Sequence, residues 1–529
     1  MKRSSAGILA CSALCLVGMV STAQAQAKKA AAPAGPFKQT AYIKASNPDA
    51  NDHFGDGAAL EGHGVAISGD GNTLAVGAPF EASKAKGING DQADNSLYSA
   101  GAVYVYARKG NTWVQQAYIK ASNPGTSDQF GHYVSLSQDG NTLAVSAHFE
   151  ASKSKGINGD QADRSDPQAG AVYLFTRTGT TWAQQAYLKA SNAGEEADGD
   201  QFGFSLALSA DGKTLAVGAI AEDSNAKDVN GDQNDNSMQS AGAVYIFTRT
   251  GNTWAQQAYV KAPNTDPGDM FGYAVGLSAD GNTMAVAAYD EDGGSRTIDG
   301  AFDHARRGSG AVFVFTRTGT AWARTGYLKA VSGEANDSMG YDVAISQDGN
   351  TIAAGSGDED CMKGGINPTG CDGDMKSDTS SGAAYVFVRD TATGKWSEQA
   401  FIKSSNPGVE DWFGSRIALS GDGNTLAVGA QMENGNSKGL NGNEKDQTAD
   451  DSGALYIFVR NGNTWSQQTY MKGTNTEAYD EFGGAPALNK DGKVLAVGAR
   501  GESGGAKGVN ADQKDNSAMG AGAVYIFNR

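Results

Sequence analysis

Residues 133–147 read YVSLSQDGNTLAVSA, and residues 170–190 read GAVYLFTRTGTTWAQQAYLKA. Together they predict four short β-strands, at 133–137, 142–147, 170–175 and 182–190. The Asp-Gly turn after the first strand recurs at intervals of 68 to 74 residues, so the chain holds seven copies of one unit. The turn aspartates are Asp70, Asp139, Asp211, Asp280, Asp348, Asp422 and Asp491. A period of this length is typical of a repeat architecture.

The first and last parts of the repeat region complement each other. The seventh copy shows three strands and ends with GAVYIFNR at 522–529, whereas residues 37–45, FKQTAYIKA, match a fourth strand and belong to no complete copy. A closed ring needs this exchange because it removes an open sheet edge. We therefore predict an all-β fold, a seven-bladed β-propeller with four strands per blade, in which the N-terminal strand completes the last blade.

We expect one propeller over residues 37–529. The predicted blades span about 53–121, 129–191, 201–262, 270–330, 338–404, 412–473, and 481–529 plus 37–45. Residues 1–25 have the basic, apolar and small-residue order of a secretory signal, with cleavage expected after Ala25, and 26–36 form a short linker. A lipoprotein signal using Cys11 is the alternative.

No other segment approaches the ~18 apolar residues of a membrane span, so we expect no membrane span. The chain is expected to be a secreted, periplasmic or cell-surface monomer. In such a compartment disulfides persist, and we predict a disulfide between Cys361 and Cys371 rather than free thiols.

The second strand of each copy, as in LAVGA at 74–78, is apolar on both faces and is expected to be buried on both sides. Each fourth strand ends near a lysine, which we interpret as a guard against edge-to-edge pairing. These lysines are Lys44, Lys120, Lys189, Lys261, Lys329, Lys403 and Lys472.

Charge is concentrated in two sets of connections. We call the connections between second and third strands the long loops, and the connections between blades, each leading to a Phe-Gly or its equivalent, the crossovers. The long loops are 79–99, 148–168, 220–240, 289–309, 357–381, 431–452 and 500–521. Because strand direction alternates, both sets emerge on one side of the ring, the loop face.

The loop face carries 47 of the 59 Asp and Glu residues and 16 Lys and Arg, a formal charge of −31. Such a field repels nucleic acid and attracts cations or basic proteins. We therefore expect no nucleic-acid partner.

The long loops repeat a pattern rich in Asn, Asp and Gly, which offers the oxygen ligands that calcium prefers. The candidate ligands are Asn89, Asp91, Asp94, Asn158, Asp160, Asp163, Asn230, Asp232, Asp235, Asn510, Asp512 and Asp515. An upstream glutamate such as Glu81 and the aspartate two residues before Phe-Gly, such as Asp52, are candidates to complete a shell. The alternative is that these residues only form turns.

The repeated Phe-Gly, as at 54–55 and 130–131, followed by Gly-Ala-Pro at 77–79 or Gly-Ala, resembles the FG-GAP repeats of the integrin α-subunit propeller and its bacterial counterparts. The resemblance covers 37–529 and implies a seven-bladed propeller that engages protein or glycan ligands through loops on one rim. Integrin-like repeats often bind calcium in the hairpin between the first two strands, and here that hairpin is too short. We expect Asp70 and its counterparts to be turn residues.

Three functions remain open. The first is a non-catalytic binding propeller for adhesion or recognition of a protein, glycan or basic surface. The second is a secreted hydrolase or lyase at the mouth of the central channel, for which the pair His132 and His148 is the best catalytic candidate, although no motif of a known catalytic site accompanies it. The third is a structural, cation-dependent envelope component.

Blades 4 and 5 depart most from the shared pattern and are the expected place for a local ligand site. The candidates there are Asp290, Glu291, Asp292, Asp303, Asp372 and Asp374.

Overall fold

The computed structural model describes residues 35–55, 62–193, 199–371 and 379–529. Its strands form seven separate antiparallel sheets, the blades. Blade 1 consists of β2 (Val65–Ile67), β3 (Thr73–Ala78), β4 (Ala102–Lys109) and β5 (Thr112–Ile119). Blade 2 consists of β6 (Val134–Leu136), β7 (Thr142–Ala147), β8 (Ala171–Thr178) and β9 (Thr181–Leu188). Blade 3 consists of β10 (Phe202–Leu208), β11 (Thr214–Ala219), β12 (Ala243–Thr250) and β13 (Thr253–Val260).

Blades 4 to 7 follow the same order. Blade 4 consists of β14 (Phe271–Leu277), β15 (Thr283–Ala288), β16 (Ala311–Thr318) and β17 (Ala321–Leu328), and blade 5 of β18 (Val343–Ile345), β19 (Thr351–Ser356), β21 (Ala383–Arg389) and β22 (Trp396–Lys403), with β20 (Gly365–Ile366) on its outer edge. Blade 6 consists of β23 (Arg416–Leu419), β24 (Thr425–Ala430), β25 (Ala454–Asn461) and β26 (Thr464–Met471). Blade 7 consists of β27 (Ala487–Leu488), β28 (Val494–Ala499), β29 (Ala523–Asn528) and β1 (Lys38–Ile43).

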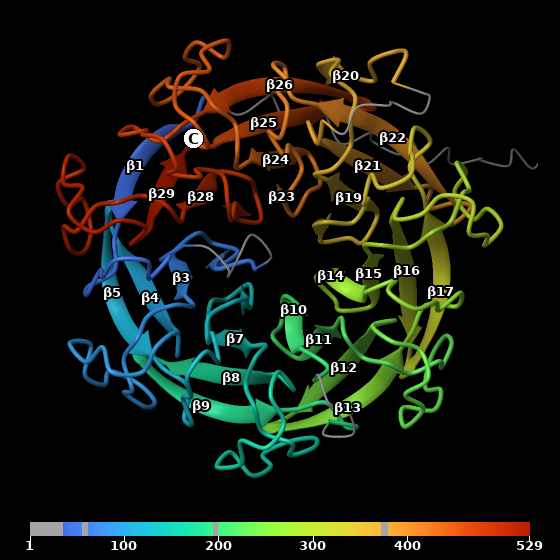
Figure 1. Cartoon of the computed structure of the whole chain (residues 1–529), viewed down its shortest axis with the longest axis horizontal. Helices are drawn as coiled ribbons and strands as arrows, with labels where there is room; N and C mark the ends of the chain where they lie inside the picture. Colours follow the sequence, from blue (N-terminus) through green and yellow to red (C-terminus); the bar gives the residue numbers. More distant parts are fainter. Residues whose placement is uncertain (1–34, 56–61, 194–198, 372–378) are drawn as a thin grey trace, which may run out of the picture. The chain divides into compact units, whose positions relative to one another are not determined.

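The seven blades are arranged as a β-propeller, as the sequence predicts (Figure 1). Within each blade the first strand lies nearest the central channel and the fourth strand forms the outer wall. The innermost strands β2, β6, β10, β14, β18, β23 and β27 contribute to the lining of that channel.

The ring closes as predicted, because β1 pairs with β29 rather than with a neighbour in sequence. Arg529 reinforces this seam. Its guanidinium donates to Gln468 and Thr425 of blade 6, at 2.8 and 2.6 Å, and lies over the ring of Phe37, 4.6 Å from its centroid. The closing strand β1 is thus held by its pairing with β29 and by the contact between Phe37 and Arg529.

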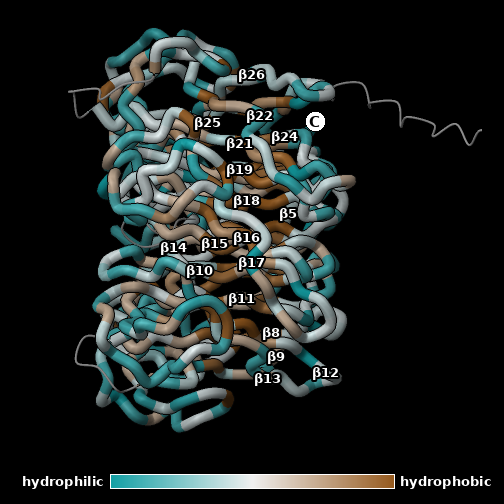
Figure 2. Tube along the Cα trace, turned by 90° about the vertical axis from the view of Figure 1, so that its right-hand side faces the viewer, coloured by the Kyte–Doolittle hydropathy of each residue, from teal (hydrophilic) through white to brown (hydrophobic). Residues whose placement is uncertain are grey.

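The core lies between blades. All six residues of the second strand are buried in every blade, for example in β3 and β7, which confirms the prediction from their two apolar faces. One cluster joins Val103 and Ile119 of blade 1 to Leu143 and Tyr173 of blade 2. Figure 2 shows the apolar strands in the middle of the molecule and polar loops on either side.

The short turns meet on the rim opposite the loop face. Backbone amides there link neighbouring blades, for instance Gly69 to Gln138 and Gln138 to Ala210, with N–O distances of 2.9 Å. In the turn itself Asp70 accepts from Ser68 Oγ and from the Asn72 amide. Asp70 is therefore a turn residue, as expected.

The Phe-Gly motif anchors each crossover to the preceding blade. The amide of Phe130 donates to the carbonyl of Ala100, and the Phe130 ring is fully buried. Gly131 has φ +98°, and a Cβ there would lie 2.5 Å from the carbonyl oxygen of Ala102. Glycine is required here because the chain passes this close to its neighbour.

Within the described ranges, no helix has the length and apolar character needed to cross a membrane. The expected signal peptide and its cleavage after Ala25 lie outside the described residues.

Candidate functional site

A buried ion pair recurs in every blade, at the base of the long loop. The lysine at the end of each fourth strand pairs with a glutamate at the start of the long loop, with Nζ–Oε2 distances of 2.5 to 2.9 Å in six blades and a still closer contact in blade 5. The pairs are Lys44–Glu502, Lys120–Glu81, Lys189–Glu150, Lys261–Glu222, Lys329–Glu291, Lys403–Glu359 and Lys472–Glu433.

Blade 3 shows how the pair is completed. Glu222 accepts from Lys261 at 2.7 Å, from the hydroxyl of Tyr259 at 2.6 Å and from Asn192 of the incoming crossover at 3.2 Å. Tyr245 in turn donates to Asn192 Oδ1 at 2.5 Å. One carboxylate therefore fastens the long loop, the outer strand and the crossover to one another.

These pairs correct one sequence-based expectation. The lysines do not guard an exposed edge, because they are at most 2% exposed. Burial lowers the pKa of Lys120, and the neighbouring Glu81 opposes that shift. Glu81 and its counterparts bind lysine, and a part for them in a calcium shell stays a prediction. The signal was present in the sequence, since Glu and Lys recur in register in all seven copies.

The aspartate two residues before Phe-Gly is also buried. Its Oδ2 accepts from the backbone amide three residues earlier, as between Asp52 and Asp49 at 3.0 Å. Burial raises the pKa of Asp52, Asp269 and Asp337 to about 8. The crossovers into blades 1, 4 and 5 thus each carry a carboxyl group that holds its proton unusually well.

The loop asparagines predicted as calcium ligands extend the outer edge of each blade. Asn89 is held at φ +56°; its amide donates to the Tyr118 carbonyl at 2.7 Å, and its Oδ1 accepts from the Tyr118 amide at 3.0 Å. The backbone amide and the side-chain oxygen of Asn89 thus make the pair of hydrogen bonds that a neighbouring strand would make with Tyr118. The same pairing is made by Asn158, Asn230 and Asn510.

The loop aspartates cap turns. Asp91 Oδ1 accepts from the Ala93 amide at 2.9 Å, and Asp94 Oδ1 from the Ser96 amide at 2.8 Å. The equivalent bond to the amide two residues later is made by Asp160, Asp232, Asp235, Asp512 and Asp515, whereas Asp163 Oδ2 accepts from the Lys153 amide at 2.7 Å. Among the described residues, no three His, Cys, Asp or Glu side chains form a group able to hold a metal ion. Calcium binding by these loops stays a prediction.

The blade 4 candidates are not equally accessible. Glu291 is the buried partner of Lys329 and is 1% exposed, so it does not face a ligand. Asp290 and Asp292 are half-buried, and Asp303 is exposed, with its Oδ1 accepting from Gly294 and Ala305. In blade 5, Asp372 and Asp374 lie outside the described residues.

Cys361 and Cys371 form the predicted disulfide, with their Cα atoms 5.4 Å apart. Both are buried against the aromatic core of blade 5, beside the buried Glu359.

The channel end at the loop face is aromatic, a feature not predicted from sequence. Phe204, Tyr273 and Tyr341 each follow a Phe-Gly or its equivalent and pack into one cluster. Tyr289 stacks on Tyr273 with centroids 4.5 Å apart, and Trp412 approaches Tyr341 at 6.4 Å. Tyr289 and Trp412 are half-buried and so remain partly accessible.

His132 and His148 do lie together, with ring centroids 3.8 Å apart. Both are buried, at 0% and 2% exposure, and burial lowers the pKa of His132 to about 3. They are neutral, packed imidazoles. This environment gives no support to acid–base chemistry near neutral pH.

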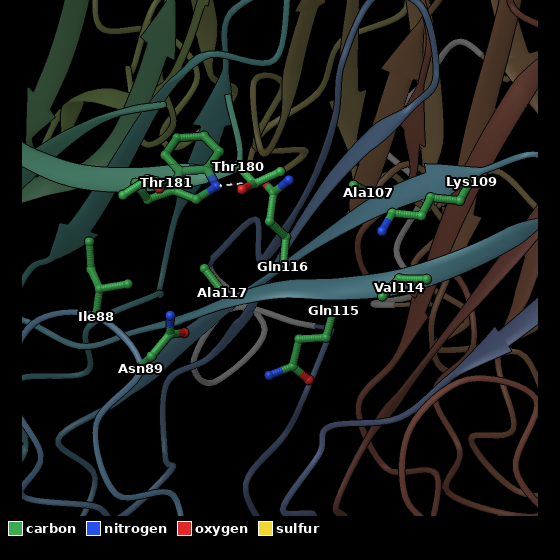
Figure 3. A pocket seen from close by; sticks show the side chains of 11 residues that line it. Ile88, Asn89, Ala107, Lys109, Val114, Gln115, Gln116, Ala117, Thr180 and Thr181 are labelled. Carbon is green, nitrogen blue, oxygen red and sulfur yellow. Dashed lines mark hydrogen bonds between the residues drawn. The ribbon is translucent and has the colours of Figure 1, made fainter. Parts of the chain in front are cut away.

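A groove of about 460 Å³ runs along the outer wall between blades 1 and 2 (Figure 3). Gln116 and Gln115 leave β5 on opposite sides, and Gln116 Oε1 accepts from Trp182 Nε1 of the next blade at 2.9 Å. A similar groove of about 560 Å³ lies beside β1. The side chains that bond across the first groove join blades, so we assign that groove a structural role.

The buried pairs also change the charge of the loop face. Adding the seven lysines to the 16 bases counted above gives 23 against 47 acids, a formal charge of −24 rather than −31. The face remains strongly acidic.

Three segments of the chain, residues 113–175, 182–247 and 396–458, match the FG-GAP repeat family. The search among curated proteins gives no match. Similar solved structures include the periplasmic gluconolactonase PpgL of Pseudomonas aeruginosa, 14% identical over 78% of this chain and 86% of that one with a TM-score of 0.43. The Cps50 (Swd1) propeller domain of Myceliophteria thermophila is 10% identical over 89% and 97% of the two chains, with a TM-score of 0.45.

Kuenenia stuttgartiensis hydrazine synthase is 12% identical over 83% of this chain and 93% of that one, with a TM-score of 0.44. At these identities and scores the solved structures carry no argument about activity. The seven sheets show that the chain is a seven-bladed β-propeller, and three of its segments match the FG-GAP repeat family.

Proposed function

We propose that this protein is an exported, non-catalytic binding propeller that holds a positively charged protein partner on its loop face. The observation that carries the proposal is the concentration of charge, −24 on one face of a chain whose total is −17. A field of one sign on one face steers and orients a partner of opposite sign.

The buried network beneath that face supports the same proposal. Each long loop is tied to its outer strand by a glutamate such as Glu222, and in blades 1 to 4, 6 and 7 that glutamate also accepts from an asparagine of the incoming crossover. A loop that is already ordered loses little conformational entropy on binding. Export is supported by the signal-like N-terminus and by the disulfide.

A glycan is the second candidate ligand. Half-buried Tyr289 and Trp412 at the channel end offer aromatic faces, and Tyr289 Oη lies 3.3 Å from Asp358 Oδ2. Aromatic faces beside carboxylates suit sugar rings, which present apolar faces and hydroxyl edges.

The test compares two variants of equal charge. The first replaces Asp91, Asp160 and Asp232 by Asn on the loop face of blades 1 to 3; the second replaces Asp70, Asp139 and Asp211 by Asn on the opposite rim of the same blades. Binding of an oligolysine peptide is measured by surface plasmon resonance at about 50 and 500 mM NaCl.

We expect the loop-face variant to bind several-fold more weakly at low salt, and the opposite-rim variant to bind like the wild type. Equal weakening in both variants would refute a face-specific site. A glycan array run in parallel tests the second candidate, with Trp412→Ala as the variant expected to lose any signal.

A further inference from the structure

The central channel has an apolar lining near the rim opposite the loop face. The last side chain of every innermost strand contributes to it, and we call these seven side chains the collar. Leu208 of the collar is 9% exposed, and the other six side chains are half-buried. The channel is therefore walled by aliphatic groups that remain in contact with solvent. The collar consists of Ile67, Leu136, Leu208, Leu277, Ile345, Leu419 and Leu488.

Two cavities meet at the collar. One, of about 170 Å³, extends from the collar to the short turns, and the other, of about 240 Å³, extends toward the loop face. We call the two together the channel cavity. Five collar side chains line both parts, namely Ile67, Leu136, Leu208, Leu419 and Leu488.

Backbone hydrogen bonds between blades fix the entrance to the channel cavity. One residue of each short turn lines this entrance, and its amide donates to the carbonyl of the corresponding residue in the next blade, at 2.9 to 3.4 Å. Because the bonds join backbone to backbone, the width of the entrance does not depend on side chains that rotate. The series runs from Lys490 through Gly69, Gln138, Ala210, Ala279 and Gln347 to Gly421.

Three polar side chains stand in the described lining of the entrance. Gln138 and Gln347 are half-buried, and Lys490 is exposed. Amide N–H groups and an ammonium group are the donors that a carboxylate accepts. The remaining turn positions of the entrance have no side chain larger than a methyl group and leave it open. They are Gly69, Ala210, Ala279 and Gly421.

The inner part of the channel cavity is lined by a carboxylate of the protein. Asp342 is 5% exposed, its Oδ1 accepts from the Val343 amide and its Oδ2 from the Ile417 amide, both at 2.8 Å. A second carboxylate beside Asp342 would be repelled. An anionic group is therefore favoured at Lys490 and disfavoured at the inner end, whereas an uncharged chain suits the collar between them.

We propose that the channel cavity binds a linear aliphatic carboxylate, with its head group at Lys490, Gln138 and Gln347 and its alkyl chain against the collar. Small-molecule sites combine apolar walls with a few polar groups that orient the ligand, and this lining has that composition. Burial of the chain provides most of the affinity, since each buried methylene group is favourable. The site opens on the face opposite the one proposed for the basic partner and does not depend on that proposal.

The experiment is calorimetric titration of the mature protein with hexanoate, octanoate and decanoate, and with octylamine as the cationic counterpart of octanoate. We expect the affinity to rise about fourfold for each added methylene group until the cavity is filled. Octylamine should bind at least tenfold more weakly than octanoate.

Variants test the two ends of the site separately. Ile67→Trp fills the collar and should abolish binding, whereas Val114→Trp adds the same ring to the outer wall of blade 1, where Val114 is 41% exposed, and should bind like the wild type. Lys490→Gln should weaken octanoate several-fold without weakening octan-1-ol. Lys493→Gln is its control, because Lys493 is exposed nearby and lies outside the lining of the cavity.

Circular dichroism melting checks that Ile67→Trp is folded, and Leu277→Phe is the second way to fill the collar. Three results would overturn the proposal. The first is no heat of binding with any carboxylate at millimolar concentration, and the second is unchanged octanoate binding in a folded collar variant. The third is equal affinity for octanoate and octylamine, or octanoate binding that Lys490→Gln leaves unchanged.

Discussion

At the scale of single residues, the most consequential groups are the buried lysine–glutamate pairs. Taking two charges out of water is costly, and the cost is recovered only when each oxygen and each proton has a partner. Glu222 meets this condition through Lys261, Tyr259 and Asn192. Seven such pairs therefore hold the loops in place, and each is vulnerable to loss of one member.

Lys261→Met should lower the free energy of unfolding by about 3–5 kcal/mol, because it leaves the Glu222 carboxylate buried without a counter-charge. Lys227→Met is the matched control, since Lys227 is exposed in the same blade. Urea denaturation measures both. Equal, small effects for the two variants would show that the buried pair does not stabilise the fold.

The buried crossover aspartates predict a dependence of stability on pH. An aspartate titrates near 4 in the unfolded chain, whereas burial raises the pKa of Asp269 to about 8. Between these values the folded state keeps a proton that the unfolded state has released. Stability is therefore greatest below about pH 4 as far as this group is concerned, falls as pH rises to about 8, and is level above it.

Asp269→Asn should remove that contribution, because the amide cannot ionise. We expect the loss of stability between pH 5 and pH 9, measured in calcium-free buffer, to shrink by about 2–4 kcal/mol. The neighbouring acids Asp266, Glu291 and Asp292 remain in this variant. An unchanged pH profile would mean that Asp269 is ionised in the folded protein.

At the scale of elements, a tryptophan at the start of one outer strand joins several neighbouring blades by donating to a glutamine of the preceding outer strand. This bond is present for Trp182, Trp254, Trp322 and Trp465, at 2.9 to 3.1 Å. Blade 4 has Thr325 at the glutamine position, and Trp396 Nε1 of blade 5 has no hydrogen-bond partner among the described residues. The junction between blades 4 and 5 therefore lacks the bond that these four tryptophans make.

Thr325→Gln should restore the missing acceptor and raise the free energy of unfolding by about 0.5–1.5 kcal/mol. Thr325→Leu is the control, because it adds apolar bulk without an acceptor. Thermal melting of the two variants separates the effects. If the leucine variant gains as much as the glutamine variant, the orphan indole is not the cause.

At the scale of the whole molecule, the ring depends on one strand from the other end of the chain. Deleting residues 36–46 removes β1 and with it the Lys44–Glu502 pair. We expect the truncated protein to aggregate or to melt without cooperativity, because β29 becomes an open edge. A protein beginning at residue 35 is the control, and size-exclusion chromatography with calorimetry is the measurement. A monomeric product with an unchanged Tm would contradict the closure argument.

The sequence was sufficient to predict the architecture because repetition makes a weak strand signal strong. Seven copies of the same apolar pattern also identified the exchange of β1 into the last blade. The local roles were harder to predict. Lys261 and Glu222 lie 39 residues apart, and only the fold shows that the outer strand returns to the start of the long loop. Likewise Arg164 and Asp128 lie 36 residues apart in the chain, and only the fold shows that they form an ion pair.

The closure by β1 also means that the last blade can form only after the end of the chain has been synthesised. Thr40 bonds to Ile526, 486 residues later in the chain, and synthesis at about 5–20 residues per second needs roughly 25–100 s to produce that partner. Throughout this interval β1 has no strand partner, and the incomplete ring exposes unpaired strand edges that are prone to aggregation. Contacts of such long range form slowly. We therefore expect pairing of β1 with β29 in the last blade to be the late step that completes the native fold.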